Sequence, residues 1–363
     1  MRASRQGAKF YCALRLGVKS FSTINPLFSL SQFFHMIRSI FTLFCIVPLF
    51  ALSQQPVFLR DGGLAHTFSI VARDSVTGEM AVGVQSHWFS VGTAVSWAEA
   101  GVGAVATQSF VNKSYGIKGL ALMKAGKTAA EALQALLADD EGREVRQVAM
   151  VDNQGRVAAY TGKHCIDYAS DITGRNFSVQ SNMMLNNKVC GAMASAFEQN
   201  KQLPLAERVL KALEAGQKAG GDVRGKQSAA ILVVAAKSEG QPWNERLVDL
   251  RVEDNTAPLV EMDRLLRLHR AYEHMNNGDL YTEKNDMAGA MREYGAAMKA
   301  FPDNLEMQYW TAITLANNGK IAAAESRLQS IYKKDPNWRA LTTRLPKVNL
   351  LTVSPEDLKK LTR

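Results

Sequence analysis

Several common catalytic and cofactor-binding motifs are absent from the 363-residue sequence. It contains neither G-x-S-x-G nor H-E-x-x-H, so the usual local signatures of α/β-hydrolases and zinc metalloproteases are excluded. The segments "AGKT" (125–128) and "GVGAVA" (101–106) each lack a glycine that a phosphate-binding or dinucleotide-binding loop requires. His66, His87 and His164 are not spaced as metal ligands. We therefore expect no cofactor and no metal site.

Acidic side chains are absent from residues 1–53, which carry six basic ones. Removing these six charges from the formal net charge of +9 leaves +3 on residues 54–363. That part of the sequence has no basic stripe with interleaved aromatic residues, which is the footprint of a nucleic-acid-binding surface. We therefore expect no nucleic-acid partner.

The N-terminal apolar run is too short to span a bilayer comfortably. This run, "IFTLFCIVPLFAL" (40–52), follows the basic segment "MIRS" and ends near the small residues that signal peptidase reads. These features predict a signal peptide over Met36–Ser53, with Met36 as the true start, residues 1–35 dispensable and a spacer over 54–65. We expect export to the periplasm or the medium. An uncleaved membrane anchor is the alternative.

Cysteine is scarce, and the four cysteines match no zinc-binding spacing. Cys12 and Cys45 lie in the segment that we expect to be removed. Cys165 and Cys190 remain, and an oxidising compartment would allow them to pair. Two unpaired buried thiols are the alternative, and the sequence leaves both open.

Strand and helix patterns alternate in blocks between residues 67 and 254. In chain order we expect two hairpins (67–87 and 93–109), two helices (115–126 and 128–140), a hairpin (146–162), a strand (177–184), two helices (187–200 and 204–219) and two strands (227–236 and 245–254). Antiparallel strands separated by helix pairs indicate two sheets between helix layers. The fold class is therefore α+β, with a four-layer α-β-β-α sandwich over residues 66–257.

Strand signals end near residue 258, where an Ala-rich helical pattern begins. Pro302 and Pro336 lie 34 positions apart, and two alanines repeat at the same spacing. This period resembles that of tetratricopeptide repeats. We expect a tetratricopeptide-like helical region over 258–345, followed by a C-terminal tail over 346–363. Fewer than three repeats are visible, so they need the first domain or a protein partner to pack against. An ordinary helical extension is the alternative.

The first domain contains several distinctive blocks: "HTFSIVARDSVTGEMAVGVQSHWFSVG", "WAEAGVGAVATQS", "YGIKGLALMKAG", "RQVAMVDNQGRVAAYTG", "FSVQSNMM" and "GDVRGKQSAAILVV". Together these blocks resemble a bacterial family called domain of unknown function 1028, and the resemblance covers roughly residues 65–275. That family is similar in fold to the N-terminal nucleophile hydrolases. In that superfamily the mature chain begins with Thr, Ser or Cys at the head of the first strand.

The resemblance implies that Thr67, which heads the first predicted strand, is a nucleophile. A free α-amine has a pKa near 8, so a useful fraction is neutral near pH 7 and can take the proton of the hydroxyl in the same residue. This role requires a cut between His66 and Thr67. Without the cut, Thr67 is a β-branched strand residue.

Other candidate site residues accompany Thr67. The resemblance implies a lysine some thirty residues after the nucleophile, but no lysine occurs between Thr67 and Lys113, and Glu99 occupies the corresponding region. Glu99 would accept a proton or hold the α-ammonium group. Ser69 shares a strand face with Thr67 and would assist it or bond a neighbouring strand. Asn182 would donate to an oxyanion or occupy a turn.

Two functions remain open. The first is an exported hydrolase of amide-type bonds in a small molecule or peptide, with Thr67 as the N-terminal nucleophile. The second is a non-catalytic exported binding module whose helical repeats recruit a protein partner. Assembly into a homo-oligomer fits either function.

Overall fold

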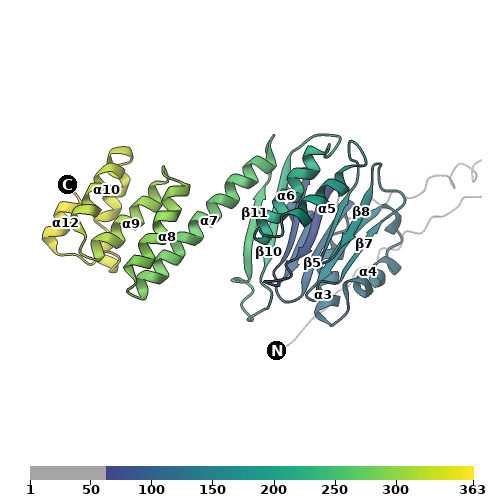
Figure 1. The fold of residues 1–363 in the computed structure, drawn as a ribbon, viewed down its shortest axis with the longest axis horizontal. Coiled ribbons are helices and arrows are strands. Elements are labelled where there is room, and N and C mark those ends of the chain that lie inside the picture. The colour runs from purple at the N-terminus through teal and green to yellow at the C-terminus, as the bar shows by residue number, and fades with distance from the viewer. Residues whose placement is uncertain (1–62) are drawn as a thin grey trace, which may run out of the picture. The chain divides into compact units, whose positions relative to one another are not determined.

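Two antiparallel sheets form the centre of the first domain (Figure 1). The computed structural model describes residues 63–363, so the predicted signal peptide, most of the spacer, Cys12 and Cys45 lie outside the described residues. Among residues 63–363, no helix has the length and apolar character that a membrane span requires.

The first sheet has five strands. Its path is β1-β5-β6-β7, and β4 also pairs with β5. The bounds are Leu64–Ala65 (β1), Ser96–Glu99 (β4), Gly103–Phe110 (β5), Arg146–Asp152 (β6) and Val157–Thr161 (β7). The short helix α2 (Gly92–Val95) leads into β4.

The second sheet has six strands in the order β11-β10-β3-β2-β9-β8. The bounds are Thr67–Arg73 (β2), Met80–Ser86 (β3), Ser170–Gly174 (β8), Phe177–Ser181 (β9), Ser228–Val234 (β10) and Arg246–Val252 (β11). The chain therefore passes from the first sheet to the second at His66, the single residue between β1 and β2.

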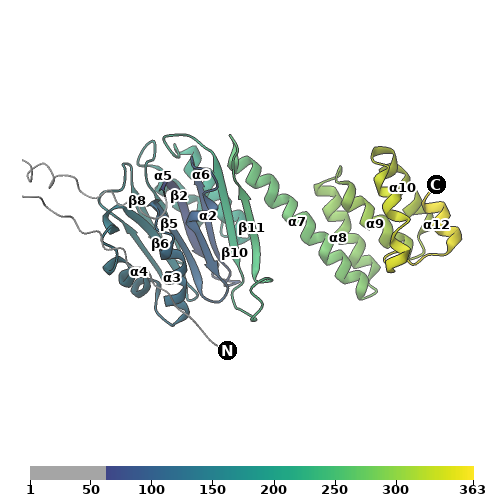
Figure 2. The same cartoon turned by 180° about the vertical axis from the view of Figure 1, so that it is seen from behind.

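Helices cover the outer face of each sheet and confirm the predicted four layers. Helices α5 (Val189–Gln199) and α6 (Leu205–Lys218) pack on the six-stranded sheet (Figure 1), and α3 (Ser114–Lys124) and α4 (Ala129–Ala138) pack on the five-stranded one (Figure 2). The 3₁₀ turn η1 (Arg143–Val145) leads into β6.

Local sequence features explain two of these helices. The N-terminus of α4 carries a capping box between Thr128 and Glu131. Gly83 in β3 lets α6 approach closely, because a Cβ atom there would lie 2.2 Å from Val209 Cγ1.

Alternate residues of β2 point to opposite sides of its sheet. Phe68 and Ile70 belong to the core under α5 and α6, whereas Val71 belongs to the core between the two sheets. Because side chains two apart share a strand face, Thr67 and Ser69 point toward the five-stranded sheet. This alternation places two hydroxyl groups between the two sheets.

The rest of the chain is helical, and residues of α7 contribute to two cores. The elements are α7 (Pro258–Glu283), α8 (Met287–Ala300), α9 (Leu305–Asn317), α10 (Ile321–Lys334), α11 (Asn337–Thr342), η2 (Leu345–Val348) and α12 (Pro355–Leu361). Met262 and Leu266 of α7 pack with α6 and β11, while Ala271 and Met275 pack with α8. Leu361 in the C-terminal tail is buried in the core formed by α9 and α10.

Candidate functional site

Thr67 is buried at the point where the chain crosses between the sheets. The residues before it pair with β5, as Leu64 with Phe110 and Ala65 with Ser109. Thr67 itself pairs with Ser86 of β3. The Thr67 side chain is fully buried, and its Oγ1 donates a hydrogen bond of 2.8 Å to the carbonyl oxygen of Ala65. The hydroxyl group therefore lies against the segment that precedes it.

The carbonyl group of His66, which forms the peptide bond to Thr67, accepts two side-chain hydrogen bonds. Ser86 Oγ donates to this oxygen at 2.6 Å, and Arg224 Nη2 donates at 2.7 Å. One donor is cationic, and charge-assisted hydrogen bonds are roughly twice as strong as neutral ones. Two donors on one carbonyl oxygen favour the build-up of negative charge there when a nucleophile attacks the carbon.

Arg224 is held in place by Asp222, two residues earlier in the loop between α6 and β10. Arg224 Nε donates to Asp222 Oδ1 at 3.0 Å, and Nη2 donates to Oδ2 at 2.7 Å. Asp222 is buried and also accepts a hydrogen bond from the backbone N–H of His87 at 3.1 Å. The guanidinium group is therefore oriented by a fixed carboxylate.

The His66 side chain fills a buried pocket beside this carbonyl group. Its Nδ1 lies 2.7 Å from Asn182 Oδ1, and its ring meets the Phe110 ring edge-on, with centroids 5.7 Å apart. Its Nε2 is buried without a hydrogen-bond partner. Burial is the main cause that lowers the pKa of His66, so the ring is neutral at pH 7.

A chain of buried amide groups connects this pocket to β2. Gln147 Nε2 donates to the backbone carbonyl oxygen of Ser181 at 2.9 Å, so Gln147 Oε1 is the acceptor end. This Oε1 accepts from Gln108 Nε2 at 2.7 Å and from Asn182 Nδ2 at 2.9 Å. Gln108 Oε1 in turn accepts from Ser69 Oγ at 2.5 Å. These contacts determine which end of each side-chain amide is the donor and which is the acceptor.

The backbone is strained next to two of these amides. Ser109 follows Gln108 with φ 72°, and Met183 follows Asn182 with φ 58°. Non-glycine residues rarely adopt positive φ, and such conformations collect at functional sites. Ser109 lies near the end of β5 and Met183 just after β9, so both strained residues lie where strand ends meet around His66.

The structure brings together three of the four predicted site residues. Thr67, Ser69 and Asn182 all belong to the buried cluster around His66. Asn182 does not present its donor to the His66 carbonyl group, because its Nδ2 is bonded to Gln147. The donors at that oxygen are instead Ser86 and Arg224.

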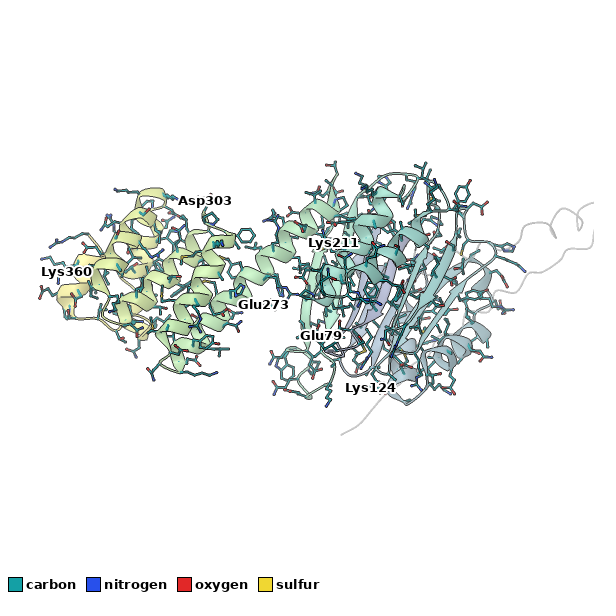
Figure 3. All side chains as sticks on the ribbon, in the orientation of Figure 1. Glu79, Lys124, Lys211, Glu273, Asp303 and Lys360 are labelled. Atoms are coloured by element: carbon teal, nitrogen blue, oxygen red, sulfur yellow. The ribbon has the colours of Figure 1, made fainter. Side chains whose placement is uncertain are left out.

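Glu99 lies away from this cluster. It pairs with Gly103 at the start of β5, whereas Gln108, five residues further along β5, is the residue that contacts Thr67. At about 3.3 Å per strand residue the two ends are roughly 17 Å apart. The Glu99 side chain is 38% exposed and forms a 2.6 Å ion pair with Lys124, which Figure 3 labels. The Glu99 carboxylate therefore faces solvent rather than Thr67, because β4 lies at the edge of its sheet.

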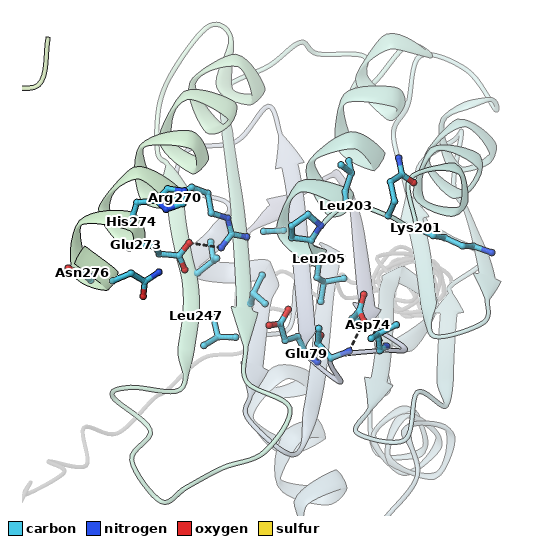
Figure 4. A pocket seen from close by; sticks show the side chains of 18 residues that line it. Asp74, Glu79, Lys201, Leu203, Leu205, Leu247, Arg270, Glu273, His274 and Asn276 are labelled. Carbon is cyan, nitrogen blue, oxygen red and sulfur yellow. Dashed lines mark hydrogen bonds and ion pairs between the residues drawn. The ribbon is translucent and has the colours of Figure 1, made fainter. Parts of the chain in front are cut away.

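A separate hollow of about 890 Å³ lies beyond the far end of β2 (Figure 4). Asp74, Glu79 and residues of α7 line it. Its Arg270 is bonded to Glu207 and to Glu273 at 2.7–2.9 Å, so the strongest charges there are already paired. Burial raises the pKa of the Glu79 carboxyl. This hollow shares no lining residue with the cluster around His66.

Sequence analysis did not identify Ser86, Gln147 or the Asp222–Arg224 pair. The stretch "GDVRGK" contributed to the family resemblance, but no local motif marked its arginine. Cys165 and Cys190 are both buried and unpaired. Among residues 63–363, no group of three His, Cys, Asp or Glu residues is arranged to hold a metal ion.

Comparison with known proteins agrees with this architecture. A family model described as "Family of unknown function (DUF1028)" matches residues 67–262, and a tetratricopeptide repeat model matches residues 281–345. The solved structure of protein SPO2555 from Silicibacter pomeroyi, described as family-model DUF1028, is similar with a TM-score of 0.51 and 30% sequence identity. That match covers 56% of this chain and 85% of the other. No curated protein matches.

Proposed function

The chain belongs to the family of unknown function DUF1028, and we propose that its first domain is a self-processing hydrolase of amide-type bonds with Thr67 as the nucleophile. One observation carries the proposal: Ser86 and Arg224 both donate to the carbonyl oxygen of the peptide bond that precedes Thr67. The family match begins at residue 67, which supports Thr67 as the first residue of the mature domain.

The processing step is an N-to-O acyl shift. Thr67 Oγ1 attacks the carbonyl carbon of His66, and the developing negative charge on the oxygen is stabilised by Ser86 and Arg224. The bond between His66 carbon and Thr67 nitrogen breaks, and the hydroxyl proton passes to that nitrogen, directly or through water. Water then hydrolyses the resulting ester. The products are a carboxylate at His66 and a free amine and hydroxyl group at Thr67.

The same groups would serve the mature enzyme. The free α-amine takes the hydroxyl proton of Thr67 when that hydroxyl attacks a substrate carbonyl group. A cation beside an amine lowers the pKa of the amine. Arg224 would therefore lower the pKa of the Thr67 α-amine, in place of the lysine that the resemblance implies and the sequence lacks. The acyl-enzyme on Thr67 is then hydrolysed by water.

Covalent labelling tests this function. Processed protein treated with a β-lactone that acylates N-terminal nucleophiles should gain one adduct on the peptide that begins at Thr67. Thr67→Ser should keep the adduct, and Thr67→Ala should lose it, while Ser195→Ala, a change on the exposed surface of α5, should leave labelling unchanged. A processed protein that is never acylated at Thr67 would contradict the proposal.

Export remains part of this proposal. The signal features of Met36–Ser53 support it, and a cut before Thr67 would release the domain from any segment ahead of it, including an uncleaved anchor. Cell fractionation with a tagged C-terminus should find the chain in the periplasm or the medium.

A non-catalytic binding module is the second candidate. It is favoured by the tetratricopeptide match over residues 281–345, since such repeats generally mediate protein–protein interaction. In this case Thr67 stays buried under Ala65 and His66, and the uncut chain is the functional form.

A further inference from the structure

We propose that the space occupied by residues 64–66 in the uncut chain is the acyl-binding site of the mature enzyme, and that it takes peptides. The bound peptide would extend along β5 and end in a residue whose side chain is a neutral N–H donor, such as histidine or glutamine. This inference rests on the proposed function and specifies its substrate class.

The edge of β5 provides the backbone half of this site. Strand β4 pairs with β5 only over Gly103–Ala106, and β1 pairs with it at Ser109 and Phe110. When residues 64–66 leave, the β5 edge at Ser109 and Phe110 loses its strand partner. An extended peptide can add to such an edge by the same main-chain hydrogen bonds.

The pocket of His66 provides the side-chain half. Because Gln147 Nε2 is committed to the Ser181 carbonyl oxygen, Gln147 Oε1 must face Asn182 Nδ2. Asn182 therefore presents Oδ1 to the occupant of the pocket, as it does to His66 Nδ1 at 2.7 Å. An occupant without a donor would leave this buried oxygen unsatisfied, which costs about 1–3 kcal/mol.

Charge further restricts which side chains the His66 pocket can bind. A carboxylate has only acceptor atoms at pH 7 and would face the acceptor Asn182 Oδ1. A lysine or arginine side chain would bring a second cation into a buried pocket beside Arg224. The lowered pKa of His66 agrees with a site that prefers a neutral ring. The Phe110 ring lies nearly perpendicular to the His66 ring, with the two centroids 5.7 Å apart, and this arrangement favours a flat side chain in the pocket.

The chemistry at this site conserves the arrangement seen in the uncut chain. The substrate carbonyl oxygen takes the place of the His66 oxygen between Ser86 and Arg224. Thr67 Oγ1 forms an ester with the substrate carbon while the carbon–nitrogen bond breaks, and the leaving amine receives the proton through the Thr67 α-amine. Water then attacks the ester, which returns a peptide carboxylic acid and free Thr67.

A series of peptide amides that differ only in the last residue tests this side-chain preference separately from hydrolysis itself. Processed wild-type protein is assayed with acetyl-Leu-Ala-X-aminomethylcoumarin, in which X is His, Gln, Met, Lys or Glu. Gln and Met have similar length and differ in the donor, so kcat/KM should be about tenfold or more higher for Gln, as expected for one satisfied hydrogen bond. Lys and Glu should be poorer than Gln. In Asn182→Leu, the ratio of Gln to Met should fall to about one.

The affinity for the product peptides tests the same side-chain preference without catalysis. Calorimetry with processed protein should show tighter binding of acetyl-Leu-Ala-Gln acid than of the Met peptide acid. Equal kcat/KM and equal affinity for the two peptides, or a preference for Lys or Glu, would overturn the inference while leaving hydrolysis by Thr67 intact. A chain that is never cut before Thr67 would overturn both.

Discussion

Arg224 follows His66 by 158 positions in the sequence, yet its Nη2 donates a 2.7 Å hydrogen bond to the His66 carbonyl oxygen. The loop after α6 therefore places a cation on the peptide bond that joins β1 to β2. Together with Ser86, Arg224 binds the carbonyl oxygen of the residue that immediately precedes Thr67.

Loss of the Arg224 cation should slow processing strongly. We expect Arg224→Gln to reduce the rate of the cut before Thr67 by about a hundredfold, since one donor to a developing oxyanion contributes about 10²–10³ in rate. Intact mass against time measures the cut. Arg224→Gln leaves buried Asp222 unpaired, so the double variant Arg224→Gln/Asp222→Asn should process equally slowly yet regain thermal stability. Unchanged processing in both would contradict the oxyanion role.

Loss of the Ser86 hydroxyl group should have a smaller effect. A neutral hydrogen bond is about half as strong as a charge-assisted one, so we expect Ser86→Ala to slow the cut by about tenfold. Ser86→Thr, which keeps a hydroxyl group, is the matched variant and should process faster than Ser86→Ala. A rate equal to that of the wild type for Ser86→Ala would show that this hydroxyl only satisfies a buried carbonyl group.

Glu99 should be dispensable for chemistry. We expect Glu99→Gln to leave the rate of the cut and the labelling of Thr67 unchanged, because Glu99 lies at the other end of β5 and is paired with Lys124. The same labelling assay as for Thr67→Ala checks this. Slower acylation in Glu99→Gln would restore the proton-accepting role that the sequence suggested.

The uncut chain should lose stability in mild acid. Burial lowers the pKa of His66 in the folded state below its ordinary value of 6.5. Its contribution to stability is therefore present above about pH 6.5 and is lost as the pH falls through the lower folded pKa. Thermal midpoints of uncut Thr67→Ala should fall between pH 7 and pH 5 by more than those of Thr67→Ala/His66→Gln. Parallel curves would show that His66 protonation does not affect folding.

Close packing of α6 on β3 should depend on Gly83. An added Cβ would lie 2.2 Å from Val209 Cγ1, so Gly83→Ala should destabilise the domain by about 1–3 kcal/mol through overpacking. Gly191 in α5 has no neighbouring atom within 4 Å of an added Cβ. Gly191→Ala should therefore be neutral or stabilise by up to about 1 kcal/mol. Denaturant unfolding of both variants measures the difference.

Local patterns were sufficient for much of the fold. The alternation of side chains along a strand predicted that Thr67 and Ser69 share a face, and the helical pattern that begins at residue 128 predicted the start of α4. These features depend on residues within a few positions of each other. The family resemblance and the repeat spacing also agreed with the matches over residues 67–262 and 281–345.

The site could be predicted only in part, because it is assembled from distant strand ends. Asn182 was identified by its residue type, but the direction of its amide depends on Gln147, 35 positions earlier. Glu99 was predicted to act on Thr67 from its position in the sequence, yet β4 is an edge strand and leaves this carboxylate in solvent beside Lys124. Arg224 carried no local signal, since its role follows from a contact between the loop after α6 and the junction of β1 with β2.

The most direct test of the account is the intact mass of the protein purified from the cells that produce it. The account predicts a chain that begins at Thr67, and the same mass should appear slowly when purified uncut chain is incubated alone. A stable chain that begins near Gln54 and remains uncut would contradict the central claim that Thr67 becomes a free N-terminal nucleophile.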